Sequence, residues 1–304
     1  MRPITKTMRI THCLTVACFL LVGTLAWAAE SKAPLAPEII AAAERGEADA
    51  QYQVARACLR GEGMPKDVKR AYELMKASAD KGQVEAIGGL GYFHGAGVVV
   101  PKNDKLAAEW LRKGAEKGSA KARLNLGKLL LTGNGGEDDA TPENLRDEGM
   151  QWIRKAADQG LPEAALAYGS ILYFGEHAAA QDYAKAATFF KLAADQGLPD
   201  AQNFLGTMNE LGLGMPVNVA AATDWYRKAA LQGQLKAQSN LGTILNPLAG
   251  DKATRMEALA WLIIADGQGE VTAAKMLQDT VPGLKDGELD EAQKQAADLR
   301  RSIR

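Results

Sequence analysis

The side chains that most often perform catalysis or bind metals are few in this chain, and their spacing predicts no active site. Beyond residue 28 the sequence contains two histidines, His94 and His177, and one cysteine, Cys58. Neither histidine falls in an HExxH pattern or stands at a metal-ligand spacing from the cysteine. A GxSxG elbow, a Walker loop and a dinucleotide fingerprint are also missing. We therefore expect no catalytic residue, no metal and no cofactor.

Two further features could be mistaken for sites. The segment GNGGEDD at residues 133–139 lacks the alternating ligands and the distal Glu of an EF-hand loop, and the Lys-Ser/Thr of a phosphate loop. We interpret it as a solvated loop in which Asp138 and Asp139 are ordinary surface residues; a role for residues 134–143 stays open. Cys58 is expected to be a small buried hydrophobe rather than a reactive thiol.

Composition and charge indicate a globular chain that does not bind nucleic acid. Of the 304 residues, 47% are hydrophobic and 24% are charged, which disfavours both wholesale disorder and a protein with many membrane spans. The net charge is −1, and the residues after Ala28 hold 33 basic and 37 acidic side chains. Such a chain has no basic excess to attract phosphates. Glycine is frequent, with 31 residues, and must occupy special positions in helical segments.

The first 28 residues resemble a cleavable secretory signal peptide. Three basic residues (Arg2, Lys6, Arg9) precede an apolar stretch at 14–25, and Ala26-Trp27-Ala28 offers a small-x-small cleavage site. A retained anchor and a lipoprotein at Cys18 are the alternatives, although a dozen apolar residues fall short of the roughly 20 that span a bilayer. We expect a periplasmic or secreted protein with no membrane span, in which Cys58 has no disulfide partner.

A unit of about 36 residues recurs six times after this segment. Its first landmark is an alanine, and its last is a glycine that closes the unit. The alanines are Ala50, Ala86, Ala122, Ala164, Ala201 and Ala237, and the glycines are Gly82, Gly118, Gly160, Gly197, Gly233 and Gly269. The intervals between alanines are 36, 36, 42, 37 and 36 residues, so the two markers share one period.

Each unit predicts two helices joined by a loop. The first helix ends at a loop glycine, which is Gly61, Gly97, Gly133, Gly175 or Gly212 in the first five units. The second begins at a residue whose side-chain oxygen can accept a hydrogen bond from a free N–H group of the first turn. These predicted N-caps are Asp67, Asn103, Thr141, Asp182, Asn218 and Thr254, with Pro142 in the first turn of the third unit.

Two further sets of residues recur at fixed places in the units. A glycine lies inside the first helix at Gly91, Gly127, Gly169, Gly206 and Gly242, and tryptophan lies in the second helix at Trp110, Trp152, Trp225 and Trp261. A helix glycine costs up to about 1 kcal/mol relative to Ala, so we expect a neighbouring helix to pass close to it. We interpret the tryptophans as core residues packed opposite small residues, rather than as a sugar-binding strip.

The predicted domain organisation follows from these landmarks. Residues 1–28 form the signal peptide and 29–36 a linker. Residues 37–46 form an N-terminal capping helix, 47–270 six repeats, and 271–304 the C-terminal capping helices, which expose polar faces to water as the ends of a stacked array require.

The unit resembles the Sel-one-like repeat (SLR), a relative of the tetratricopeptide repeat. Shared features are Ala-x-x-x-Leu-Gly, a loop glycine, a Pro-Lys-Asp-type turn and Ala-x-x-Trp-x-x-x-Ala-Ala-x-x-Gly, clearest in residues 86–118 and 201–233. The resemblance implies an all-α fold, in which antiparallel helix pairs stack into a right-handed α-solenoid with a concave groove. This sequence departs from the family pattern at Ala55, in the insertion of the third unit and at Leu248.

The resemblance implies a non-enzymatic scaffold that binds a peptide or protein segment in its groove. Together with the signal peptide, it leads us to expect an exported monomer that acts as a regulator or assembly factor at the cell envelope. Candidate groove residues are those that vary between units on the first helices: Arg56, Tyr92, Lys128 and Tyr173. A generic solvated face is an equally good interpretation of this row. The alternative function is a hydrolase acting on cell-wall or β-lactam substrates, which is claimed for relatives with paired cysteines that this chain lacks.

Overall fold

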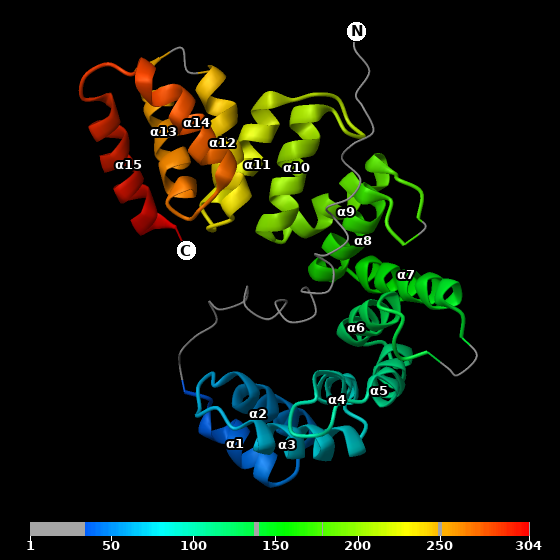
Figure 1. Ribbon diagram of the computed structural model, residues 1–304. Coiled ribbons are helices and arrows are strands. Elements are labelled where there is room, and N and C mark those ends of the chain that lie inside the picture. The colour runs from blue at the N-terminus through cyan, green and yellow to red at the C-terminus, as the bar shows by residue number, and fades with distance from the viewer. Residues whose placement is uncertain (1–33, 137–139, 178, 249–250, 304) are drawn as a thin grey trace. The chain divides into compact units, whose positions relative to one another are not determined.

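The fold consists of helices that follow one another along the chain, and within each of its two parts most helices pack on the next one in sequence (Figure 1). It is taken from a computed structural model that describes residues 34–136, 140–177, 179–248 and 251–303. The predicted signal peptide at 1–28 and the pair Asp138–Asp139 lie outside these residues. All regular secondary structure in the described part of the chain is helical, as the repeat pattern predicts.

The chain divides into two compact units, and the boundary falls between Leu145 and Arg146. Helices of the first unit are α1 (Pro37–Glu44), α2 (Ala48–Arg60), α3 (Val68–Asp80), α4 (Val84–Ala96), α5 (Asp104–Glu116) and α6 (Ala120–Leu131). The boundary lies within α7 (Pro142–Asp158). The second unit continues with α8 (Pro162–Phe174), α9 (Tyr183–Asp195), α10 (Pro199–Leu211), α11 (Val219–Ala230), α12 (Leu235–Leu248), α13 (Lys252–Asp266), α14 (Val271–Thr280), a 3-10 turn (Val281–Gly283) and α15 (Glu288–Ser302).

Each predicted pair of helices is present, and the helix starts follow capping chemistry. The side chains of Asp67, Asn103, Asp182 and Asn218 accept a hydrogen bond from the backbone N–H three residues later, and Thr141 does the same for Asn144. The sixth predicted cap is wrong. Asp251 caps α13 and accepts bonds from both the N–H and the hydroxyl of Thr254, so the helix begins three residues earlier than predicted.

Glycine ends both kinds of helix. Where the first helix of a repeat ends, as at Gly97, φ lies between 65° and 78°. The glycines that close the repeats, such as Gly118, also have positive φ. An L-residue with a Cβ pays a steric penalty in this region, so a helix stops there and the chain turns back.

The glycines inside the first helices are places where the second helix of the same repeat comes close. A Cβ on Gly91 would lie 2.5 Å from Leu111 Cγ, and one on Gly242 would lie 2.6 Å from Leu262 Cγ. Phe190 makes the equivalent contact with Gly169, at 2.9 Å. Gly127 is buried on α6. The residue opposite the glycine is therefore the one that follows the tryptophan position, not the tryptophan itself.

This corrects the expectation that the tryptophans pack opposite the small residues. Trp110, Trp152 and Trp225 are only half-buried. The lysine three residues later covers each ring, with Nζ between 4.1 and 4.7 Å from the ring centroid, a cation–π geometry (Lys113, Lys155, Lys228). These three rings lie at the edge of the core because one helix turn cannot direct two adjacent residues to the same neighbour.

Trp261 differs because the last helix covers it. It is 1% exposed and belongs to a cluster that includes Ala296, Leu299 and Ile303, which come from α15 and the residue after it. The buried face of α15 is small, while Asp298, Arg300 and Arg301 remain exposed. A helix with one apolar stripe and a charged outer face ends the stack without exposing the core.

Buried amides link successive helices of the second unit. Gln202 Nε2 donates to Ala194 O at 3.2 Å, and Gln238 Nε2 donates to Ala230 O at 3.3 Å. In turn, Gln232 donates to Gln202 Oε1 and Gln268 to Gln238 Oε1. The Nε2 and the Oε1 of each buried glutamine thus have a hydrogen-bond partner, as buried polar groups require.

Candidate functional site

The side chains that could act as nucleophile or base lie on different elements of the fold. Cys58 is 1% exposed, its Sγ lies 3.4 Å from Met64 Sδ, and burial raises the pKa of its thiol. A neutral buried thiol is a poor nucleophile. Burial also lowers the pKa of His94 and of His177, and neither imidazole has a hydrogen bond or ion pair to a nucleophile among the described residues. They lie in different loop-end regions, on α4 and after α8.

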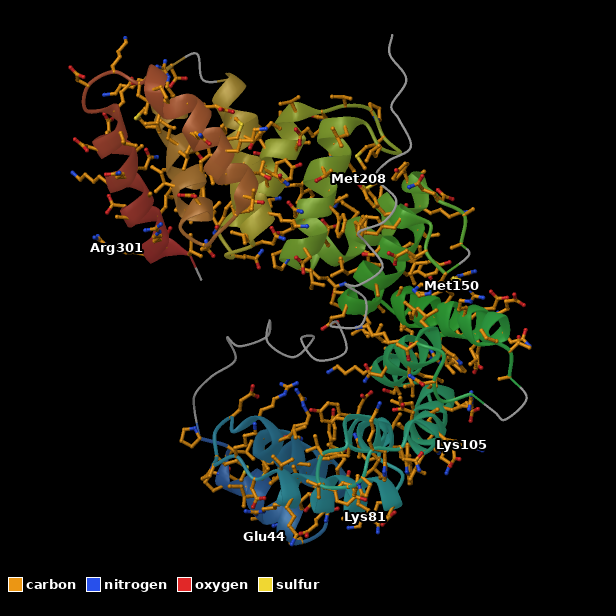
Figure 2. The ribbon with its side chains drawn as sticks, viewed as in Figure 1. Glu44, Lys81, Lys105, Met150, Met208 and Arg301 are labelled. Carbon is orange, nitrogen blue, oxygen red and sulfur yellow. The ribbon has the colours of Figure 1, made fainter. Side chains whose placement is uncertain are left out.

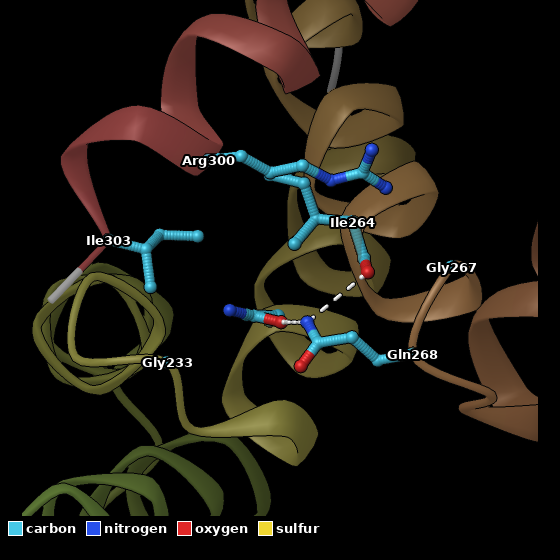
Figure 3. Close-up of a pocket in the computed structure, with 7 residues that line it drawn as sticks. Gly233, Ile264, Gly267, Gln268, Arg300 and Ile303 are labelled. Atoms are coloured by element: carbon cyan, nitrogen blue, oxygen red, sulfur yellow. Dashed lines mark hydrogen bonds between the residues drawn. The ribbon is translucent and has the colours of Figure 1, made fainter.

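A pocket of about 350 Å³ lies near the C-terminal end of the second unit (Figure 3). Its polar side chains are engaged with the protein: Gln268 Nε2 donates to Gln238 Oε1 at 2.7 Å and to Ile264 O, and Arg300 Nη2 donates to Ile263 O at 3.3 Å. No carboxylate, histidine or cysteine lines this pocket. No group of three potential metal ligands occurs within the described residues either.

Three of the four predicted groove residues lie at equivalent positions in the first unit. Arg56 is on α2, Tyr92 on α4 and Lys128 on α6, and α4 packs directly against α6. Tyr92 is 42% exposed, the Arg56 guanidinium carbon lies 5.7 Å from the centroid of the Tyr52 ring, and Lys128 is half-buried. These cationic and aromatic residues occupy the same position in three successive first helices. We call Arg56, Tyr92 and Lys128 the α2–α4–α6 row.

The helices that carry this row have a net positive charge. Residues 48–131, which comprise α2 to α6, contain 15 Lys and Arg against nine Asp and Glu, a net charge of +6. The whole chain is close to neutral, so the excess belongs to this part of the molecule. A local cationic field of this kind attracts acidic segments over about a Debye length, which is ~8 Å at physiological salt.

The fourth predicted residue, Tyr173, belongs to the second unit and has different neighbours. Its ring packs against Phe174, Tyr183, Phe190 and Phe204 with centroids 4.9 to 6.0 Å apart, and Phe190 and Phe204 stack at 4.5 Å. Burial raises the pKa of the Tyr173 phenol. Tyr173 is thus part of an aromatic cluster that spans α8, α9 and α10.

Sequence reasoning singled out one of the five rings in this cluster. The available signal was the density of aromatic residues in the fourth repeat, where Tyr168, Tyr173, Phe174, Phe189 and Phe190 fall within 23 residues. The contact with Phe204 comes from the next repeat, and spacing within one repeat could not reveal it.

The repeats match a known family. The Sel1 repeat matches residues 48–83, 84–119, 120–161, 162–198 and 199–234, which is more than half of the chain. The chain belongs to the Sel1 repeat family. The sixth predicted unit is not among these five matches, although α12 and α13 form a helix pair there. The α12–α13 connection lacks the loop glycine, with Leu248 at that place, so this unit has lost part of the sequence pattern while its helices remain paired.

Solved structures resemble this Sel1 repeat protein. A Sel1 repeat protein from Oxalobacter formigenes has 28% sequence identity and a TM-score of 0.63, with 77% of this chain and 91% of that chain covered. The immunity protein Pa5087 from Pseudomonas aeruginosa has 20% identity, coverage of 75% and 76%, and a TM-score of 0.45. A protective antigen of uropathogenic Escherichia coli with an SLR fold has 23% identity, coverage of 87% and 71%, and a TM-score of 0.39. No curated protein matches the sequence.

The fold and the family together support a helical repeat scaffold for protein–protein interaction. Sel1 repeats generally mediate contacts between proteins, and consecutive helix pairs present side chains at a regular spacing. None of the described helices has the length and apolarity needed to cross a membrane.

Proposed function

We propose that this Sel1 repeat protein is an exported, non-enzymatic scaffold whose α2–α4–α6 row binds an acidic protein segment. Helix pairing in the repeat uses glycine at one position of the first helices, and the position that follows it carries Arg56, Tyr92 and Lys128 in the first three repeats. The observation that carries the proposal is the row itself, which places two cations and a 42% exposed tyrosine at equivalent positions within a region of net charge +6.

The chemistry of the row suits carboxylates next to apolar or aromatic groups. Arg56 can donate paired hydrogen bonds to a carboxylate, and Lys128 adds a second positive charge. Tyr92 can bury an apolar side chain of the partner while its hydroxyl stays wet. No covalent chemistry is needed, so binding and release would follow salt concentration and the partner's charge.

Export is the second part of the proposal and rests on residues 1–28 alone. Their basic head, apolar stretch and Ala-x-Ala site are typical of secretory signals. The periplasm is the favoured compartment, where the scaffold would act as a regulator or assembly factor at the cell envelope. Cell fractionation and N-terminal sequencing test this directly. A mature protein that begins at Ala29 in the periplasmic fraction is expected, and an uncleaved chain in the cytoplasm would contradict export.

Charge reversal tests the binding surface. The double variant Arg56→Glu/Lys128→Glu should weaken binding of a fluorescent peptide of alternating Glu and Tyr by roughly tenfold or more, measured by anisotropy at low salt. The matched control is Lys76→Glu/Lys117→Glu, which makes the same charge change at exposed positions on α3 and after α5. Helical content should be wild type in both.

The two double variants separate a local site from a diffuse field. Loss of binding in the first variant alone supports the row. Equal loss in both variants would show that only the net charge matters, and binding unchanged in both would rule out this surface. Affinity capture from a periplasmic extract, with the Arg56→Glu/Lys128→Glu chain as the negative control, then identifies the partner.

A further inference from the structure

The second unit has an exposed apolar edge that the α2–α4–α6 row does not include. Eight large hydrophobic side chains are exposed within the described residues, and four of them lie between residues 174 and 219. They are Phe174 (50% exposed), Leu211 (59%), Val217 (62%) and Val219 (39%). We call these four residues the 174–219 edge. Scattered single hydrophobics are normal on a surface, whereas a local group marks a contact site.

Contacts inside the second unit bring Phe174 and Leu211 onto one surface. The Phe174 ring lies 6.0 Å from the Phe204 ring on the neighbouring first helix. Phe204 and Leu211 are seven residues apart on α10, so they share a face of that helix. Phe174 and Leu211 are also equivalent positions, each being the last residue of a first helix. The aromatic cluster beneath Phe174 supports the surface from within.

The loop after α10 carries the two valines and is held against the same helix ends. A Cβ on Gly212 would lie 2.9 Å from Val217 Cγ2, and Asn218 N donates to Asn209 O at 2.8 Å, so the loop folds back along the last turn of α10. Further along, Gly214 packs on the backbone of Tyr183 and Ala184 at the start of α9. The edge therefore rests on fixed backbone in two successive repeats, as a docking surface requires.

The electrostatics of the edge have the opposite sign from those of the first unit. Helices α8 to α11 and their connections, residues 162–230, contain seven Asp and Glu against four Lys and Arg, a net charge of −3. Two of the four cations, Lys185 and Lys191, are paired with Asp182 and Asp195. The edge is formed by residues 170–182 and 203–221, which contain no lysine or arginine. The same stretches contain the acidic residues Glu176 and Glu210. The C-terminal ends of α8 and α10 point their carbonyl groups here, which adds negative potential.

We propose that the 174–219 edge docks a protein segment that carries apolar side chains next to lysine or arginine. The apolar residues of the segment cover Phe174, Leu211 and Val217, and its cations lie near Glu176 and the helix C-terminal ends. An acidic segment, which suits the α2–α4–α6 row, is repelled here. This Sel1 repeat protein thus has two surfaces of opposite charge preference, one in each unit, and can hold two different partners.

The test uses the full chain and two synthetic fluorescent peptides. One consists of leucine, phenylalanine and lysine, and the other has every lysine replaced by glutamate. The lysine peptide is expected to bind and the glutamate peptide to bind at least roughly tenfold more weakly at this edge. Phe174→Ser/Leu211→Ser should weaken the lysine peptide by roughly tenfold, because two apolar contacts are lost. Glu176→Lys should also weaken binding of the lysine peptide, and the loss of affinity should be larger at low salt than at high salt.

Val271→Ser is the matched control, because Val271 is 79% exposed on α14 and lies outside the edge. Val271→Ser should leave the melting temperature near wild type. Phe174→Ser also loses ring contacts with Tyr173 and Phe204, so circular dichroism at the assay temperature checks that the double variant is folded. A wild-type affinity in Phe174→Ser/Leu211→Ser would overturn the proposal. Equal affinity for both peptides in the Arg56→Glu/Lys128→Glu chain, in which the row that suits acidic segments is disabled, would also overturn it. Sedimentation of the chain alone provides the other arm: self-association that Phe174→Ser/Leu211→Ser abolishes would make a second copy the occupant and would also overturn it. The Arg56→Glu/Lys128→Glu chain should bind the lysine peptide normally, so the two surfaces can fail independently.

Discussion

The ring of Tyr226 on α11 lies directly on Gly206 of α10, so that a Cβ on the glycine would overlap Cδ1 and Cε1 of the ring. Tyr226 is 1% exposed and cannot move aside into solvent. The same contact recurs with leucine or phenylalanine at Gly91, Gly169 and Gly242. A glycine that weakens an isolated helix thus permits the closest approach between the helices of a pair.

Gly206→Ala should therefore destabilise the protein. Overpacking a rigid aromatic contact costs about 1–3 kcal/mol, which exceeds the gain of up to ~1 kcal/mol from the better helix propensity of alanine. The urea midpoint of unfolding, followed by circular dichroism, measures the difference. Gly95→Ala is the matched control: its Cβ would lie 3.4 Å from Ala107 Cβ, an ordinary contact, and stability should stay equal or rise. A higher midpoint for Gly206→Ala than for wild type would contradict the packing account.

Tyr226→Phe should lower stability at pH 8 by about 1–2 kcal/mol. The hydroxyl donates to Glu210 Oε2 at 2.7 Å and lies 3.1 Å from Thr207 Oγ1, so the variant loses a hydrogen bond to a partly buried carboxylate. Burial is the main cause of the raised pKa of Tyr226, and the bond to Glu210 adds to it. A folded-state pKa above the unfolded value of ~10 means that the stabilisation is complete below pH 10 and is lost as the pH rises above it.

The difference in stability between wild type and Tyr226→Phe should accordingly shrink between pH 9 and pH 11, by up to about 1.4 kcal/mol per pH unit above 10. Urea unfolding of both proteins at matched pH values measures this. The other tyrosines are common to the two chains, so their ionisation cancels in the comparison. A gap that widens with pH would show that the phenol ionises more easily in the folded state.

Gln238→Met should cost about 1–3 kcal/mol. The side chain is fully buried, its Nε2 donates to Ala230 O, and its Oε1 accepts from Gln268. A methionine of similar size leaves both partners without this bond. The equivalent residue Gln51 provides the control, since its Oε1 is buried and has no hydrogen-bond partner in the described residues. Gln51→Met should cost less than Gln238→Met in urea unfolding, and the reverse order would show that the amide bonds are not what stabilises the site.

Cys58 should react slowly with a thiol reagent in the folded protein. Its thiol is buried and burial raises its pKa, so little thiolate is available. In a chain with Cys13→Ser and Cys18→Ser, labelling at pH 8 should be on the order of 100-fold slower than for free cysteine and should become fast in urea. Rapid labelling without urea would show that the thiol is accessible and would restore it as a candidate nucleophile.

The positions of the helix ends could be predicted because they depend on local chemistry. Asn103 caps α5 and Gly97 ends α4 through hydrogen bonds and dihedral angles within a few residues. The cap of α13 is an exception: the repeat spacing predicts Thr254, four residues before Ala258, whereas Asp251 caps the helix. Arg56, Tyr92 and Lys128 could be grouped because equivalent residues of a repeat occupy equivalent places. The contact of Phe204 and the 174–219 edge could not be predicted in this way, because their contacts cross from one repeat to the next.

The sequence by itself determined the period, the two helices of each repeat, and the need for a small residue inside the first helix. Only the tertiary structure decided which side chain fills the space over that glycine. Trp225 and Tyr226 are neighbours on α11, and a helix turns by about 100° per residue, so only one of them can face Gly206. That choice depends on how α11 is rotated against α10, which the packing of both helices sets together. The tyrosine points inward, and the tryptophan lies at the edge of the core under Lys228.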